Sequence, residues 1–303
     1  MSTRITNGMI SRSVLSDLNR ADVQLNTTQR RLSSGKQITK PSDDPYGTSR
    51  AMVLRNDLEG NRQYQRNIGD AQAWTSVTDT ALGKMSDSLS RVRELVVQAG
   101  SDTEGPAARN AIASEIDQLI EGIKQEANAS YAGHNVLSGT AVTQRPYGTG
   151  VAGDAYQGDS GSIIREIGPG VQLKVNASAD TILGSGGGDG KLIDTLRNIS
   201  AHLKSGVPAD VDALRTTDLS SLTTQGDALS QVRAAVGSIS NRLDTAQSRL
   251  EEIEETTTKL LSNTEDADMA QTMVQFSQQQ NAYQAALRSG ANIVQASLLD
   301  YLR

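Results

Sequence analysis

The chain has 303 residues, of which 36% are hydrophobic but only 3% aromatic, with a single Trp and a single Phe. This composition excludes a thick aromatic core and favours long helices that pack through narrow seams of Leu, Ile, Val and Ala. A net charge of −6, with both signs mixed along the chain, argues against a nucleic-acid partner, which requires a basic patch. The lack of cysteine excludes disulfides and thiolate metal sites.

The first periodic stretch predicts one helix over about residues 10–34. Gly35 is suited to the left-handed C-terminal cap of this helix, and residues 42–44 offer N-cap oxygens before Pro45 at the first position of the next helix. We therefore expect two helices joined by a short linker. The apolar positions of the first helix alternate spacings of four and three residues, as in a coiled-coil seam: Val14, Leu18, Ala21, Leu25, Thr28 and Leu32.

A second, longer helix is predicted from Pro45 to about residue 100, because this stretch has no internal proline and carries a heptad seam in its second half. Trp74 within it is expected to be a core residue. A third helix is predicted over about 107–129. The seam positions of the second helix are Leu82, Met85, Leu89, Val92, Val96 and Ala99.

Residues 139–190 are rich in glycine and predict a small β-rich module. Apolar residues alternate over 163–167 and 171–175, and Gly168-Pro169-Gly170 between them favours a turn. Because glycines bound the segment and it shares no heptad register with its flanks, we expect it to be dispensable for folding of the helices.

The longest uninterrupted heptad pattern runs from Leu229 to Leu260. The pattern slips over residues 263–268 and restarts at Met269, which indicates a break between two stacked helices. A shorter helix is predicted over about 192–203.

Nothing in the sequence favours catalysis, a cofactor or a metal site. Gly158-Asp159-Ser160-Gly161 has the letters of a serine-protease nucleophile motif, but that motif requires a histidine base on a double-barrel scaffold. The only histidines are the isolated His134 and His202, so a Gly/Asp/Ser turn explains the letters better. No apolar run exceeds four residues, so we expect no membrane span. The first residues lack the apolar core of a cleaved signal peptide, so we expect no such signal.

Two separated motifs resemble the flagellin family of bacterial flagellar proteins. Residues 33–45, SSGKQITKPSDDP, match the family's N-terminal region, and Glu265-Asp266-Ala267-Asp268 resembles its C-terminal region. The resemblance implies a structural, self-assembling protein that leaves the cell through the flagellar type III export channel without a cleaved signal. It implies an extracellular location in the flagellum and, as partners, further copies of the chain, other axial proteins and an export chaperone.

Within this family, the middle and the end of the chain resemble the subunits that join the hook to the filament. The resemblance rests on residues 156–159, on residues 165–171, on Val175-Asn176 and on the ending Leu299-Asp300-Tyr301-Leu302. It implies contacts with a hook-associated protein on the hook side and with filament flagellin on the other. The alternatives are a filament flagellin and, from a different class, a cytoplasmic coiled-coil adaptor with a β module.

The expected fold is mainly α: a long antiparallel helical bundle of the N- and C-terminal regions with a small inserted β-rich domain. Residues 1–40 would pair with 268–303 as a terminal assembly region, residues 41–138 would bundle with 191–267 as a helical rod, and residues 139–190 would form the outer domain. A two-helix terminal pair leaves faces uncovered, and neighbouring subunits are the natural cover. The predicted subunit-interface residues are Val14, Leu18, Leu25, Met273, Phe276, Tyr283, Leu287, Val294, Leu298 and Tyr301. The predicted intrachain seam consists of Leu82, Leu89, Val96, Val236, Leu243 and Leu250.

Overall fold

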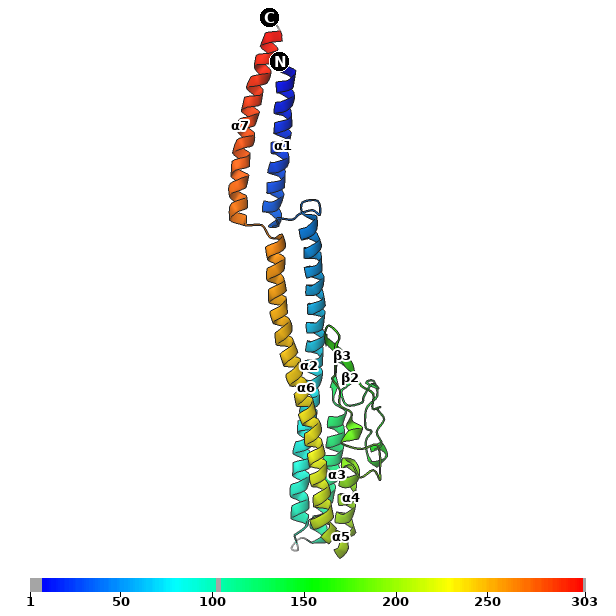
Figure 1. Cartoon of the computed structure of the whole chain (residues 1–303). Coiled ribbons are helices and arrows are strands. Elements are labelled where there is room, and N and C mark those ends of the chain that lie inside the picture. Colours follow the sequence, from blue (N-terminus) through cyan, green and yellow to red (C-terminus); the bar gives the residue numbers. More distant parts are fainter. Residues whose placement is uncertain (1–6, 102–104, 302–303) are drawn as a thin grey trace. The chain divides into compact units, whose positions relative to one another are not determined.

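The computed structural model describes residues 7–101 and 105–301. Helices dominate it, as the sequence predicts, and the strands form two small two-stranded antiparallel sheets (Figure 1). The helices are α1 (Asn7–Ser34), α2 (Pro45–Ala99), α3 (Pro106–Ala127), α4 (Leu192–Ser205), α5 (Pro208–Ala213), the π-helical η3 (Leu214–Asp218), α6 (Leu219–Glu265) and α7 (Met269–Tyr301), with 3-10 turns η1 (Val151–Gly153) and η2 (Ala179–Thr181). The strands are β1 (Ser130–Tyr131), β2 (His134–Asn135), β3 (Ile164–Gly168) and β4 (Val171–Lys174).

The helix boundaries follow from local chemistry. Gly35 ends α1 with φ +70°, and its N–H donates to the carbonyl of Arg31 at 2.9 Å. This is the left-handed cap that a residue with a Cβ adopts only with strain. Asp44 caps α2, because its Oδ1 accepts from the N–H of Gly47 at 3.0 Å and Pro45 occupies the first helical position.

The chain divides into two compact units, and α2 and α6 contribute residues to both. The first unit comprises residues 1–60 and 253–303, and the second comprises residues 61–252. These boundaries differ from the three regions expected from the sequence: residues 41–60 and 253–267 belong to the first unit, and the whole of 139–190 lies within the second. The three-region division stays a prediction.

In the first unit, α1 and α7 run antiparallel and pack against each other (Figure 1). In the second unit, helices α2, α3, α4 and α6 surround a core that includes Leu82, Leu89, Val96 and Val236, all buried. Trp74 belongs to this core, 5% exposed, with its ring edge-on to Tyr131 at a centroid distance of 6.5 Å.

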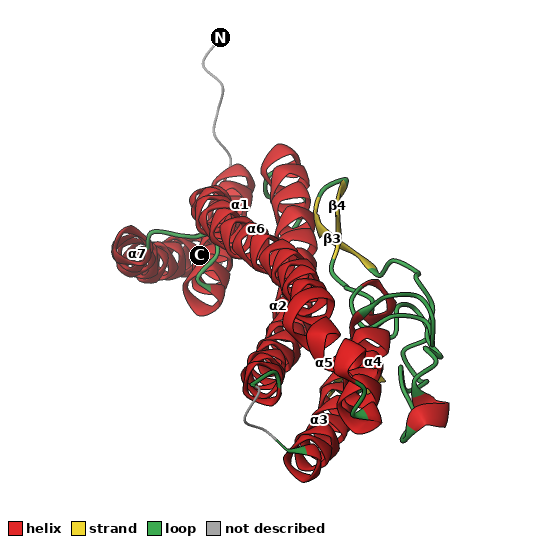
Figure 2. Cartoon of the chain, turned by 90° about the horizontal axis from the view of Figure 1, so that it is seen from below, coloured by secondary structure: helices red, strands yellow, loops and turns green. Residues whose placement is uncertain are grey.

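The β3–β4 hairpin packs on the helices through a second cluster of buried side chains, and Figure 2 shows it beside them. Arg165 pairs with Leu173 and Gly168 with Val171 across the hairpin, around the predicted Gly-Pro-Gly turn. Ile167, Leu173 and Val175 join Leu243 and Leu250 of α6 in this cluster.

The insert 139–190 also supplies side chains to the main helical core. Tyr147, Ile182 and Leu183 are each about 1% exposed and belong to the same cluster as the α2, α3 and α4 seams. This packing opposes the expectation that the segment is dispensable for folding of the helices. The heptad register predicts helix–helix seams only, so it carried no sign of a loop segment that covers them.

Candidate assembly interface

The inner face of the α1/α7 pair is narrow and partly polar. Val14, Leu18 and Leu25 are half-buried on α1. The buried Gly290 of α7 lies against the first two, so that a Cβ at position 290 would be 3.1 Å from Val14 Cγ1 and 3.7 Å from Leu18 Cδ1. A glycine at this position lets the helices approach closely.

The outer faces of the same pair carry large apolar side chains exposed to solvent. Met9 and Val23 lie on one face of α1, four turns apart, and Met269, Met273 and Leu287 share one face of α7. The exposed large apolar residues of the pair are Met9 (57%), Leu15 (63%), Val23 (64%), Met269 (47%), Met273 (60%), Val274 (58%) and Leu287 (45%). Such a concentration of apolar surface on two helices marks a surface for protein contact.

The residues expected at a subunit interface therefore divide into two groups. Met273 and Leu287 are exposed, whereas Val14, Leu18, Leu25, Phe276 and Tyr283 are half-buried. Val294, Leu298 and Tyr301 lie outside the residues whose side chains the structure describes.

Leu15, Val23 and Val274 are exposed candidates that the seam analysis missed. They lie between seam positions, which the heptad pattern assigns to solvent. The available signal was the residue type, because large aliphatic side chains at off-seam positions are unusual for a face that only meets water.

The α1–α2 connection and the α6–α7 connection are hydrogen-bonded to each other, and we call this region the joint. The N–H of Gln37 donates to the carbonyl of Glu265 at 2.7 Å, and the N–H of Ala267 donates to the carbonyl of Gly35 at 2.9 Å. The Glu265 side chain is 6% exposed and forms ion pairs with both Lys36 and Arg55. The joint thus holds a buried carboxylate between two cations, so the residues that carry the family resemblance lie together in space.

A groove lies beside this joint, with a volume of about 320 Å³. Ile38, Pro41, Ala51 and Met52 supply apolar lining, and Lys36, Lys40 and Arg55 supply positive charge. Met52 is 55% exposed. The groove belongs wholly to the first unit.

The predicted intrachain seam lies in the second unit. Leu82, Leu89 and Val96 on α2 and Val236 on α6 are at most 5% exposed and share the main core. Leu243 and Leu250 are buried with the β hairpin. Near them, the buried Asn61 of α2 donates from Nδ2 to the carbonyl of Leu250 on α6 at 2.9 Å, which sets the register of the two helices at this level.

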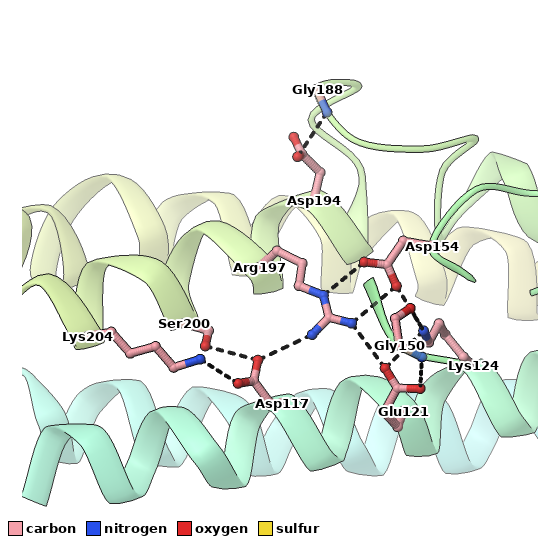
Figure 3. Close-up of polar contacts among 10 residues, drawn as sticks. All are labelled: Asp117, Glu121, Lys124, Gly150, Asp154, Gly188, Asp194, Arg197, Ser200 and Lys204. Atoms are coloured by element: carbon pink, nitrogen blue, oxygen red, sulfur yellow. Dashed lines mark hydrogen bonds and ion pairs between the residues drawn. The ribbon is translucent and has the colours of Figure 1, made fainter. Parts of the chain in front are cut away.

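Ion pairs among four charged side chains connect the insert to α3 and α4 (Figure 3). We call this group the bracket, and it consists of Glu121, Lys124, Asp154 and Arg197. Arg197 of α4 donates from Nε to Asp154 of the insert at 2.9 Å and from Nη2 to Glu121 of α3 at 3.0 Å. Lys124, whose side chain is 2% exposed, donates to Asp154 at 2.8 Å and to the carbonyl of Gly150 at 2.8 Å.

These pairs shift the pKa values of the carboxyl groups. Burial raises the pKa of Asp154, but the hydrogen bonds from Arg197 and Lys124 outweigh it, so the net pKa lies below the usual range. Burial likewise raises the pKa of Glu121, and its bonds from Lys124 and the Gly150 N–H bring the net pKa below the usual range. Both groups are charged in neutral solution.

Residues 158–161, whose sequence resembles a serine-protease motif, form a turn around Asp159. Asp159 Oδ1 accepts from the N–H groups of Thr140 at 2.5 Å and Gly161 at 3.0 Å, which is the role of a turn-forming aspartate. Among the residues that the structure describes, there is no group of three or more His, Cys, Asp or Glu placed to hold a metal ion. In the same part of the chain, no helix combines the length and the apolar character needed to cross a lipid bilayer.

Two family models match the chain. The bacterial flagellin N-terminal helical region matches residues 5–142, and the bacterial flagellin C-terminal helical region matches residues 219–302. Among relatives, "Flagellin FlaB1" of Treponema pallidum is 26% identical and covers 94% of this chain and 95% of its own length. The "Flagellar filament 31.3 kDa core protein" of Treponema maltophilum is 26% identical and covers 97% of both.

Solved structures share the fold over most of this chain. A putative flagellar hook-associated protein from Vibrio parahaemolyticus has a TM-score of 0.67 at 22% identity and covers 74% of this chain and 100% of that chain. FlgL of Bacillus cereus has a TM-score of 0.59 at 23% identity and covers 69% and 99%. The flagellar junction protein FlgL from Legionella pneumophila has a TM-score of 0.58 at 15% identity and covers 73% and 100%. With both terminal helical regions matched, the chain belongs to the bacterial flagellin family and is a structural protein of the bacterial flagellum.

Proposed function

We propose that this chain is the subunit that joins the hook to the filament, acting by assembly and without catalysis. The observation that carries the proposal is the compact insert 139–190, held on α3 and α4 by the Arg197–Asp154 bracket. The structures of FlgL from Bacillus cereus and of the flagellar junction protein FlgL from Legionella pneumophila match this fold over 99% and 100% of their own lengths. This likeness of fold to a flagellar junction protein supports the proposal.

The physical basis of the role is the terminal helix pair. Its exposed apolar faces on α1 and α7 need cover that the described residues of the first unit do not supply. We expect further copies of the chain to supply part of this cover, and other axial proteins, on the hook side and on the filament side, to supply the rest. We also expect export by the flagellar apparatus with the help of a chaperone, and a location outside the cell.

The second candidate is a filament flagellin. The relatives that match over nearly the full chain are a flagellin and a filament core protein, both 26% identical. The two roles differ in their self-contacts, because a filament subunit must bind copies of itself without limit whereas a junction subunit need only complete one short layer.

Seeded assembly separates these candidates. Purified chain is offered sheared filament seeds, a precipitating salt or isolated hook ends, and the products are imaged by electron microscopy. A junction subunit binds hook ends in a saturable layer and grows no long filament, and deletion of its gene leaves hooks without filaments while flagellin is lost to the medium. Micrometre-long tubes made of this chain alone would instead establish the filament role.

A further inference from the structure

The joint of the first unit presents two unlike surfaces on its two sides. The groove described above lies by the connection between α1 and α2, and the start of α7 lies on the other side of the α1 and α6 ends (Figure 1). A monomer therefore carries both halves of a head-to-tail contact.

The groove side is apolar and positively charged. Met52 and Ile38 line it, and Lys40, an exposed residue, stands on its rim. Lys36 and Arg55 also line it, and they share the single carboxylate of Glu265. Among the residues that line the groove, three cations stand against one carboxylate, so the lining carries a net positive charge, which favours an acidic occupant.

The α7 side is acidic and apolar. Asp266 and Asp268 are exposed, and Met269 next to them is 47% exposed. Asp268 caps α7, with Oδ1 accepting from the N–H of Gln271 at 3.1 Å, which holds the segment in one conformation. A flexible methionine beside a fixed carboxylate suits an irregular apolar groove with a cationic rim.

We propose that the groove of one copy receives Asp268 and Met269 of a second copy, with Lys40 facing Asp268. The proposal rests on the proposed function, since it names the contact by which copies would associate in a layer. Because the two halves of the contact are different surfaces, it is heterologous, and repetition closes into a ring or continues as a helix according to the rotation between copies.

The lack of cysteine in the chain allows a direct test by disulfide crosslinking. Full-length Lys40→Cys and Asp268→Cys variants are mixed and oxidised, both in concentrated solution and in layers bound at hook ends. A disulfide requires the two Cα atoms to come within about 7 Å, so a mixed dimer forms only where position 40 meets position 268 of another copy. Lys259→Cys mixed with Asp268→Cys is the matched control, because Lys259 is another exposed lysine of the same unit.

We expect mixed dimers from the 40/268 pair well above those from the 259/268 pair. Yields equal to the control, in solution and in any layer that forms, would overturn the proposal. The two hypotheses fail differently: a hook-bound layer without the crosslink refutes only this contact, whereas long tubes that contain the crosslink refute only the junction role.

Charge variants give a second measurement. Lys40→Glu and Asp268→Asn should each weaken self-association in sedimentation velocity, and Asp268→Asn keeps the capping oxygen of α7. Lys259→Glu should leave association unchanged. Equal effects of Lys40→Glu and Lys259→Glu would show a general response to net charge and would contradict the proposed contact.

Discussion

Gly290 of α7 packs against Val14 of α1 so closely that a Cβ on the glycine would lie 3.1 Å from Val14 Cγ1. The α1/α7 pair therefore depends on a small residue at this position. We expect Gly290→Leu to push the helices apart, because the inner face there has no room for a large side chain. Limited proteolysis of the soluble chain should then remove the terminal segments faster than in the unmodified protein.

Gly237 of α6 is the matched control for this substitution. A Cβ at that position meets nothing within 4 Å, so Gly237→Leu should leave the rate of terminal trimming unchanged. Equal trimming rates for Gly290→Leu and the unmodified chain would show that the pair does not depend on the close approach at Val14.

At the joint, removing the two cations should cost more stability than removing the buried carboxylate that they pair with. Lys36→Met with Arg55→Met leaves the Glu265 carboxylate, 6% exposed, without its two cationic partners, whereas Glu265→Gln leaves two cations that are about half exposed and can reach water. The double substitution should therefore destabilise the joint more than Glu265→Gln does. Hydrogen exchange at the Gln37 and Ala267 amides, which bridge the joint, measures the difference. Faster exchange in Glu265→Gln would contradict this account.

A substitution at Leu243 measures how much the buried seam of α6 contributes to the stability of the second unit. It is fully buried, in a cluster with Ile68 of α2 and Leu173 of β4. Leu243→Asp removes this apolar burial and places a charge without a partner, so it should lower the free energy of unfolding by roughly 3–5 kcal/mol. Leu260→Asp on the same helix, where the leucine is 39% exposed, should cost about 1 kcal/mol or less in the same denaturant titration. Equal costs would show that burial at 243 does not govern stability.

The sequence predicted the long helices well because their signals are local. A heptad run without proline specifies α2 and α6, and Gly35 and Pro45 mark the ends of the flanking helices to within one residue. The break between α6 and α7 at residues 266–268 was visible as a slip in the seam.

The side of a seam that meets a partner could not be predicted in the same way. Val14 and Leu18 satisfy the heptad rule because they face α7 in the same chain, whereas the exposed Leu15 and Val23 break the rule. The Arg197–Asp154 pair joins residues 43 positions apart, from a helix and an irregular loop. No periodicity connects such residues, so a long-range bracket of this kind is visible only once the chain has folded.

Acid should weaken the second unit through this bracket. The folded-state pKa values of Asp154 and Glu121 are lowered, so their contribution is complete above the ordinary values of 3.8 and 4.5 and is lost as the pH falls through the folded values. Arg197→Met should reduce stability at pH 7 and flatten the decline below about pH 4.5 in denaturant titrations at several pH values. Arg91→Met is the control, because the Arg91–Glu115 pair is about half exposed and contributes little. An unchanged acid profile in Arg197→Met would rule out the bracket as the source.

Excision of the insert measures how far the helices depend on it. Replacing residues 139–190 with a short Gly/Ser linker removes seven buried side chains from the two clusters that the helices share: Tyr147, Ile167, Leu173, Val175, Ala179, Ile182 and Leu183.

We expect this excision to lower the melting temperature, followed by circular dichroism, and to reduce helicity per remaining residue, because the exposed apolar faces of α3, α4 and α6 lose their cover. Val151→Ser with Val171→Ser is the control, since these insert residues are 72% and 46% exposed and their replacement should leave the melt unchanged. If the excised chain keeps both its melting temperature and its helical signal, the insert is a separable module after all, and the buried contacts of Tyr147 and Leu173 contribute nothing to the stability of the helices.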